Sequence, residues 1–378
     1  MQLNKMITIK EALTKKEMKD YVMFSFELYK NNPNWIPPII AEELETFDKT
    51  KNPALQTAEA HFYLAYIDGK IVGKVAAIIN WDEVNILHKR KTRFGWFDVI
   101  DDIEVTKALL NKVEELGRKH NMDHIEGPMG FSNLDKVGIL SEGFDQLGNM
   151  ITWYSQPYYI THLEQLGYIK EKEYIESDFS FKGINPEPFQ KASQLIKKRY
   201  ELRCLNFTKT KDIMPYVDKM FDLFNETYSK LQSFVPINDI QKAYFKKKYI
   251  GFINPEFIKF IVDKNDTMIA FAIVMPGFAN ALKKANGKLF PFGFYHLLQA
   301  RKHSKEIVFY LIGVHPDYQS KGVTALIFDE YYKVCEAKGI ETCIRTPELE
   351  ENHAIHNLWK HFNSKINKRR RTYKKDLI

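Results

Sequence analysis

The sequence predicts a duplicated α/β (α+β) fold, in which two modules each build a mixed sheet flanked by helices. The same order of strand and helix patterns occurs in both halves of the chain. Two hairpin signals, Asp68-Gly69 and Lys264-Asn265-Asp266, lie about 196 positions apart. A passage rich in Gly and Pro at 183–188 separates the halves, so we expect modules at 1–183 and 184–378.

Composition supports two ordinary hydrophobic cores. The 378 residues are 44% hydrophobic and 27% charged, which is typical of a globular chain. Cys204, Cys335 and Cys343 lack the spacing of metal ligands and are expected to be free thiols in the core. The first residues lack an apolar signal segment, and the longest uncharged stretch, 267–282, is broken by Pro276-Gly277. We therefore expect a soluble cytoplasmic protein.

The first half begins with a predicted strand at 7–10 and a helix at about 15–31, whose residues Met18, Tyr21 and Val22 share an apolar face. A Pro-rich passage leads into a second, short helix. Strands at 61–67 and 71–79 then form the Asp68-Gly69 hairpin. The remaining elements are predicted as a strand at 93–100, a helix at 105–120, a strand at 124–127 and a helix at 158–166 that ends at Gly167.

The second half repeats this order. It is predicted to contain a strand at 202–207, helices at about 214–231 and 239–249, and hairpin strands at 257–262 and 268–275, then a strand at 307–314, a helix at 324–338, a strand at 341–346, a helix at 352–362 and a last strand at 366–374.

The halves differ by insertions at 131–156 and 277–304. The second insertion contains the aromatic run Leu-Phe-Pro-Phe-Gly-Phe-Tyr at 289–295. One interpretation is a lid or an acyl channel. The favoured interpretation is a helix that covers one sheet face or joins the two modules.

The stretch from 306 to 327 carries the strongest chemical signal. An apolar strand ends at Val314, a Pro316-Asp317 turn follows, and Gln-Ser-Lys-Gly-Val-Thr at 319–324 leads into a helix. A helix N-terminus presents free backbone N–H groups and partial positive charge to an anion, Gly322 lets the backbone approach it, and Lys321 can add a charged contact. The pattern predicts a phosphate-binding loop. The alternative is a tight turn that only caps the helix.

This loop resembles the coenzyme A loop of the GNAT acyltransferases, commonly Gln/Arg-x-x-Gly-x-Gly/Ala. Gln319 and Gly322 match, and Thr324 stands where Gly or Ala is usual. The closing helix also resembles the family pattern, with Asn352 and Leu358 at the expected spacing. The two-module length resembles bacterial members of the superfamily whose function is uncharacterised.

The resemblance implies tandem GNAT modules with mostly antiparallel sheets and a site for acetyl-CoA or another acyl-CoA in the second module. The acceptor would be a small-molecule or peptide amine. The implied pyrophosphate contacts are the backbone amides of Gln319, Ser320, Lys321, Gly322, Val323, Thr324 and Ala325. The strand end at Ile312, Gly313 and Val314 would pair with the pantetheine arm, and Asn352 and Trp359 would lie beside the cofactor.

The first half lacks such a loop. Its counterpart carries Asp98, Asp101, Asp102 and Glu104 and no Gly, and these carboxylates would repel a pyrophosphate. A metal site is one interpretation, and a solvated turn with acids at a helix N-terminus is the favoured one. We predict that this half contributes structure or one wall of the acceptor site.

Catalytic groups are harder to assign. Glu348, Glu350 and Glu351 follow a strand near the expected cleft, where one could act as the base, although acids that cap the helix at Asn352 explain them too. Trp359 stands where the family commonly has a Tyr acid, so Tyr373 or Tyr318 is the candidate acid. His315 is a weaker candidate base, and no order of residues indicates a covalent nucleophile.

The net charge of +7 is concentrated at 365–375, a stretch with seven basic residues and no acid. The rest of the chain is formally neutral, which excludes a generally basic nucleic-acid-coating protein. We expect a solvated edge strand there, with contact to the coenzyme A 3′-phosphate or to tRNA as alternatives. Two other functions remain open beside an N-acyltransferase: a non-catalytic coenzyme A sensor, and an RNA-dependent aminoacyl or peptidyl transferase.

Overall fold

The computed structural model describes residues 6–132, 134–229, 234–250, 253–360 and 362–377. Its first half contains β1 (Ile7–Glu11), α1 (Lys15–Leu28), α2 (Ile40–Thr46), the 3-10 turn η1 (Pro53–Gln56), β2 (Ala58–Ile67), β3 (Lys70–Asn80), α3 (Trp81–Asn85), β4 (Lys91–Val99), α4 (Ile103–Lys119), β5 (His124–Gly127), β6 (Ile139–Glu142), α5 (Tyr158–Gln165) and β7 (Ile169–Ser180).

The second half repeats the pattern with α6 (Glu187–Tyr200), β8 (Arg203–Asn206), α7 (Thr210–Ile213), η2 (Met214–Tyr216), α8 (Val217–Tyr228), α9 (Asp239–Phe245), a π-helical turn η3 (Lys246–Ile250), η4 (Pro255–Phe257), β9 (Ile258–Val262), β10 (Met268–Pro276), α10 (Ala279–Ala285), α11 (Gly293–His303), β11 (Glu306–Val314), η5 (Pro316–Tyr318), α12 (Thr324–Lys338), β12 (Thr342–Leu349), α13 (His353–Trp359) and β13 (Lys365–Asp376).

The predicted elements are present, and both predicted hairpins form as β2–β3 and β9–β10. Capping explains several boundaries: Thr14 and Glu17 form a capping box at the start of α1, and Gly339 ends α12 in the left-handed conformation. The predicted helix at 214–231 begins as η2 and continues as α8, and its last residues lie outside the described part of the chain.

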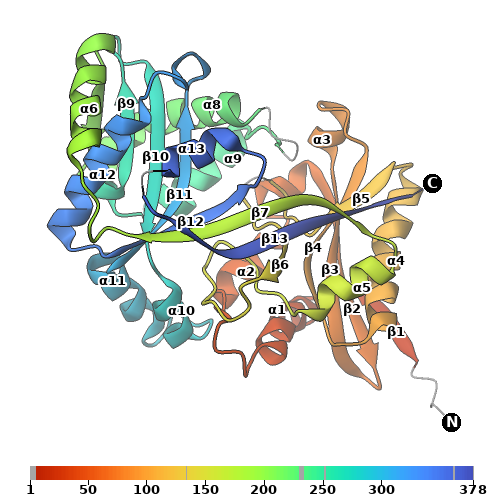
Figure 1. Ribbon diagram of the computed structural model, residues 1–378. Helices are drawn as coiled ribbons and strands as arrows, with labels where there is room; N and C mark the ends of the chain where they lie inside the picture. Colours follow the sequence, from red (N-terminus) through yellow and green to blue (C-terminus); the bar gives the residue numbers. More distant parts are fainter. Residues whose placement is uncertain (1–5, 133, 230–233, 251–252, 361, 378) are drawn as a thin grey trace.

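The sheet joins the two halves by exchanging their last strands. The strand order is β1-β2-β3-β4-β5-β13-β7-β12-β11-β10-β9-β8, and β6 pairs with β13. β13, the end of the second half, pairs with β5 of the first half, while β7, the end of the first half, pairs with β12 of the second. Figure 1 shows β7 and β13 side by side across the middle of the molecule. The sheet is therefore continuous across the expected module boundary.

The prediction of a solvated edge strand at 365–375 is wrong. β13 lies between β7 and the β5–β6 side of the sheet, so both of its edges are paired. Arg370 is 1% exposed and forms an ion pair with Glu176, which also lies 3.4 Å from the Lys368 ammonium. Glu176 lies on the neighbouring strand β7, which was not predicted from the sequence. Lys368 and the three arginines of the basic strip are thus paired with acidic side chains.

Each half packs helices on both faces of its sheet, which positions the loops of interest. In the first half α4 and α5 cover one face and α1 packs on the other. In the second half α6, α12 and α13 share one core, and α8, α10 and α11 share the core of the opposite face. Cys335 and Cys343 are buried in the first of these two cores, and Cys204 is partly buried beside it, as expected for free thiols.

The insertion at 277–304 forms α10 and α11 and joins the two halves. Leu282, Ala285 and Leu297 share a core with Ile36 and Ile39 from the first half. The amide of Ile40 also donates to the carbonyl of Gly287, at 2.9 Å. The inner side of the insertion thus performs the joining role that the sequence favoured.

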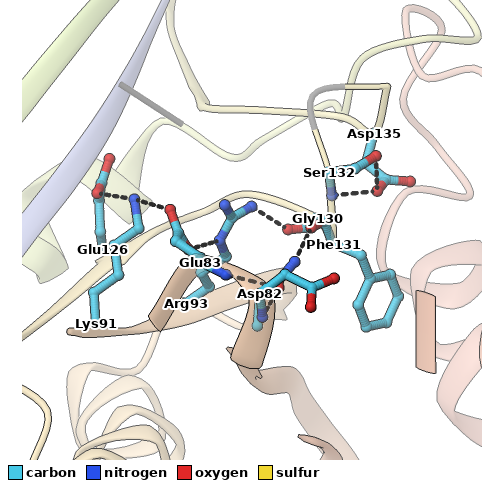
Figure 2. Close-up of polar contacts among 10 residues, drawn as sticks. Asp82, Glu83, Lys91, Arg93, Glu126, Gly130, Phe131, Ser132 and Asp135 are labelled. Atoms are coloured by element: carbon cyan, nitrogen blue, oxygen red, sulfur yellow. Dashed lines mark hydrogen bonds and ion pairs between the residues drawn. The ribbon is translucent and has the colours of Figure 1, made fainter. Parts of the chain in front are cut away.

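The insertion at 131–156 is anchored by a buried polar network at the start of β4. Lys91 lies 3.0 Å from Glu83 and 2.8 Å from Glu126, and Arg93 pairs with Glu83 at 2.9 Å (Figure 2). The Arg93 guanidinium also donates to the carbonyl of Gly130, at 2.9 Å. These contacts fix the path of the chain as it leaves β5.

Candidate functional site

The two parallel strands β11 and β12 separate at their carboxyl ends. They pair from Glu306 and Thr342 up to Phe309 and Arg345, and their described pairing ends there. β11 then continues against β10 to Val314 through a bulge opposite Ile273/Val274, while β12 stays paired with β7 to Leu349 through an irregularity between Arg345 and Glu348. Ile312, Gly313 and Val314 lie on the part of β11 beyond this pairing, beside the opening between the two strands.

The 319–324 loop follows the end of β11 and leads directly into α12. Gly322 has φ +72°, and a Cβ there would lie 2.9 Å from the Cδ1 of Ile196. No side chain caps the start of α12. Within the described residues, no intrachain acceptor is found for the loop amides of Ser320, Gly322, Val323 and Thr324. This set of free donors fits a phosphate group better than a self-capped turn.

Other loop residues hold the loop in shape. The Gln319 side chain donates to the carbonyl of Val314 at 3.2 Å, which ties the loop back to the strand. The Lys321 ammonium lies 4.5 Å from the centre of the Tyr318 ring and 5.4 Å from that of Tyr200, over exposed surface beside the loop. The His315 ring accepts from the amide of Asp317 at 3.2 Å. Three of the predicted donors already have acceptors, because the amides of Gln319, Lys321 and Ala325 donate to the carbonyls of Pro316, Tyr318 and Gly322.

Glu348 stands on β12 at the other side of the opening, and it is nearly buried. Its carboxylate forms an ion pair with Arg345 and accepts from the Trp359 indole N–H at 2.9 Å. The Nδ1 of His356 lies 3.6 Å away. Burial raises the pKa of Glu348, and Arg345 opposes this shift. Glu348 is the predicted base that the structure places in a low-dielectric position.

Trp359 and Asn352 have structural contacts. Trp359 is 2% exposed and packs with Phe309, Phe328 and Phe362 in the core beside the strands. The Asn352 side chain accepts from the amide of Ile355 at 3.3 Å and caps α13. The two residues were predicted to lie beside the cofactor, but neither contact places them next to the loop amides.

The other predicted catalytic residues lie elsewhere. Glu350 pairs with Arg369 at 2.7 Å, and this hydrogen bond lowers the pKa of Glu350. Glu351 pairs with Lys172 near the surface. Tyr373 is buried in the core of the first half, where its hydroxyl donates to Glu164 at 3.1 Å. The prediction that Tyr373 serves the second module therefore needs correction, because β13 carries it into the first module.

Two tyrosines beside the opening were not found from the sequence. The Tyr228 hydroxyl, at the end of α8, donates to the carbonyl of Ile312 at 3.0 Å. The Tyr310 hydroxyl donates to the carbonyl of Leu134 at 3.2 Å. Burial raises the pKa of Tyr228 to about 12. In the sequence, Tyr228 was marked only by its place on the aromatic face of a helix, and Tyr310 only by its place on the bulged strand.

The corresponding opening in the first half is filled by its own chain. β4 and β5 pair in parallel from Lys91 and His124 to Arg93 and Glu126. Beyond that point, the amide of Met129 donates to the carbonyl of Phe94 at 2.8 Å. The segment that leads into the insertion at 131–156 therefore lies along the edge of β4, whereas the corresponding edge of β11 in the second half is left open.

The acidic counterpart loop is also unsuited to an anion. The Asp102 side chain caps α4 by accepting from the amide of Glu104 at 3.1 Å, as expected for an acid at a helix N-terminus. The expectation that Asp98 is solvated is wrong. Its carboxylate is buried and accepts from the hydroxyls of Ser25 at 2.6 Å and Tyr29 at 2.7 Å.

The chain is similar in sequence to two bacterial proteins. No protein-family model matches the chain. The chain is 26% identical, over its full length and 98% of the relative, to Protein YghO of Escherichia coli. It is 24% identical, over 81% of its length and 80% of the relative, to Bacterial ceramide synthase of Caulobacter vibrioides.

Solved structures define the class of fold. A tandem GNAT protein from the clavulanic acid biosynthesis pathway matches with a TM-score of 0.59 and 10% identity, covering 99% of each chain. A GCN5-related N-acetyltransferase from Sphaerobacter thermophilus matches with a TM-score of 0.53 and 10% identity, covering 98% of this chain and 96% of that one. The chain therefore has the tandem GNAT fold. Among the described helices, none is both long and apolar enough to cross a membrane.

Proposed function

We propose that the chain is an acyl-CoA-dependent N-acyltransferase whose second module, 184–378, binds the acyl-CoA. The observation that carries the proposal is the row of free amides from Ser320 to Thr324 at the mouth of the β11–β12 opening. The first module supports the same assignment, because its own chain fills the equivalent opening and Asp102 caps the equivalent helix.

The acceptor is an amine in this proposal. A ceramide is an N-acylated long-chain amine, so the name of the Caulobacter relative denotes amide formation. In such a transfer the amine nitrogen bonds to the acyl carbon, the carbon–sulfur bond breaks, one proton leaves the nitrogen and one joins the thiolate. A bound acyl-CoA would supply the thioester for this step.

Glu348 is the proposed proton acceptor. It stands on β12 beyond the last residue that pairs with β11, and burial raises its pKa, which makes a carboxylate a better base near neutral pH. Tyr228 is the proposed donor to the leaving group, because its hydroxyl already reaches the Ile312 carbonyl on the β11 side. Arg345 and Trp359 orient the Glu348 carboxylate by donating to it.

The loop is tested with two glycines at the two ends of α12. Gly322 (φ +72°) lies in the loop, and Gly339 (φ +62°) lies at the C-terminus of the helix. Either Gly→Ala change costs about 1 kcal/mol of backbone strain. We expect G322A to weaken stabilisation by acetyl-, octanoyl- and palmitoyl-CoA in thermal shift at least tenfold in apparent affinity, and G339A to leave it unchanged. Equal effects of the two changes, or no stabilisation of the wild type by any acyl-CoA, would refute the loop assignment.

Catalysis is tested by thiol release across a panel of short- and long-chain amines. E348Q should lower kcat by about 10²-fold or more, the scale of general base catalysis. E350Q is the matched control, since Glu350 already pairs with Arg369 on the surface. Acyl-CoA binding without turnover for every amine would instead favour a coenzyme A sensor, in which the Trp359–Glu348 contact is purely structural.

A further inference from the structure

The outer side of the 277–304 insertion carries an exposed aromatic tip. Phe290, Phe292, Phe294 and Tyr295 are 78%, 69%, 51% and 57% exposed, respectively. They fall within six consecutive positions. The first three are the exposed phenylalanines of the described chain. Buried phenylalanines elsewhere show that this sequence ordinarily places the residue in its cores.

The tip is held out from the body of the protein by its own packing. Leu289 and Leu297 on either side pack into the core shared by the two halves. The amide of Phe294 donates to the carbonyl of Leu289 at 2.6 Å, which closes the turn. A Cβ at Gly293 would overlap the carbonyl oxygen of Lys288, so only glycine permits this fold of the chain. The aromatic rings project as a built feature of the insertion.

The charged residues of the insertion itself are all basic. The insertion from 277 to 304 contains five Lys and Arg residues and no Asp or Glu. Lys284, at the end of α10, and Lys288, two positions before Phe290, are exposed. No ion pair involving either is found among the described residues. The surface therefore presents aromatic rings beside uncompensated cations.

We propose that this tip docks the protein on the surface of a bilayer that carries anionic headgroups. Aromatic rings are stable at the depth of the headgroups, and lysines beside them gain about 1 kcal/mol each from a negative lipid surface. A tip whose rings are more than half exposed suits insertion into a deformable interface, whereas a protein partner would need a matching groove. The proposal stands independently of acyl transfer, because lipid binding is measured without turnover.

Binding is tested by co-sedimentation of the full chain with vesicles. We expect binding to phosphatidylcholine vesicles that contain phosphatidylglycerol, at least tenfold weaker binding to phosphatidylcholine alone, and weakening as salt rises. The variant F290S/F292S/F294S/Y295S should lose at least tenfold in partitioning. Its matched control is L13S/I86S/I169S/L195S, four exposed apolar residues at other places, which should bind as the wild type does.

The charge contribution is tested separately. K284E/K288E should weaken binding to the anionic vesicles at least tenfold, and K15E/K16E, exposed lysines of α1, should not. Thermal unfolding of each variant shows whether it is folded.

A position-specific measurement completes the test. In F292W, lipids brominated in the acyl chain should quench the added tryptophan much more than the native ones, of which Trp96 and Trp359 are buried. The proposal is overturned if the wild type binds neither kind of vesicle, if the aromatic variant binds as well as its control, or if the tryptophan added in F292W is not quenched. Loss of self-association rather than of vesicle binding in the aromatic variant would assign the tip to a second copy and also overturn it.

Discussion

Glu176 at the strand exchange offers a quantitative test of how the two halves are joined. It is fully buried on β7, and it neutralises two buried cations on β13, Arg370 and Lys368. E176Q keeps the shape of the side chain but leaves both cations without their counter-charge. Removing one partner of a buried ion pair costs about 3–5 kcal/mol, and here two pairs share the lost partner, so we expect at least the upper half of that range.

A comparison of how much two substitutions destabilise the protein makes the test specific. R370M removes one cation and leaves Glu176 balanced by Lys368 at 3.4 Å and by the amide of Asn149 at 3.3 Å. R370M should therefore cost less than E176Q, and adding R370M to E176Q should cost little or recover stability. The control is D266N, which affects the exposed pair with Arg203 and should cost less than about 1 kcal/mol.

The measurement is the free energy of unfolding from urea titrations at several pH values. Arg370 and Lys368 outweigh the effect of burial and lower the pKa of Glu176. A carboxyl with a depressed folded pKa contributes stability above its unfolded pKa and loses it as pH falls through the folded pKa. The difference in the free energy of unfolding between wild type and E176Q should therefore have its full value at pH 7 and should decrease below pH about 4.5. The charge argument would be refuted if E176Q lowered the free energy of unfolding at pH 7 by less than about 1 kcal/mol. It would also be refuted if R370M lowered that free energy as much as E176Q does.

Three further outcomes follow from buried groups. K91M leaves Glu83 and Glu126 without their shared cation and should cost about 3 kcal/mol or more in urea unfolding, whereas K112M, in an exposed pair with Glu115, should cost under about 1 kcal/mol. Burial raises the pKa of Cys335 to about 12 and that of Cys343 well above its usual range, so both thiols should react with Ellman's reagent at pH 8 only after unfolding. Rapid reaction of these two thiols in the folded protein would contradict their burial. Y373F should leave the rate of thiol release within about twofold of the wild type, whereas Y228F should lower that rate at least tenfold. The reason is that, of these two residues, only Tyr228 lies at the proposed site. A larger effect of Y373F than of Y228F would overturn both placements.

Local signals were sufficient for most of the fold. Hairpins such as β2–β3 depend on a few adjacent residues, and α4 depends on an apolar stripe and the Asp102 cap. The 319–324 loop was likewise predictable, because a glycine between a strand and a helix N-terminus is a local pattern. These features need no knowledge of distant chain segments.

The strand exchange was not predictable by the same reasoning. β7 begins Ile-Lys-Glu-Lys-Glu and β13 contains Lys-Arg-Arg-Arg, so each alone is typical of solvated surface. Each becomes an interior strand because its charges meet those of the other, as with Arg371 and Glu173 at 2.9 Å. Such complementarity spans nearly the whole second half of the chain and leaves no periodic signal in either strand. The placement of Tyr373 was wrong for the same reason.

The exchange also predicts how the chain responds to division at the expected boundary. A fragment 1–183 keeps β7 but lacks both of its neighbours, β12 and β13, while a fragment 184–378 keeps those two strands and lacks β7 between them. Each fragment would expose unpaired strand edges and a buried charge set of one sign, Glu173 and Glu176 in one and Lys368 and Arg370 in the other. We expect each to be insoluble alone and the two to form a soluble complex when co-expressed, measured by size-exclusion chromatography. A folded, soluble 184–378 fragment would show that the second module is independent of β7 and would contradict the view that the two halves form one structural unit.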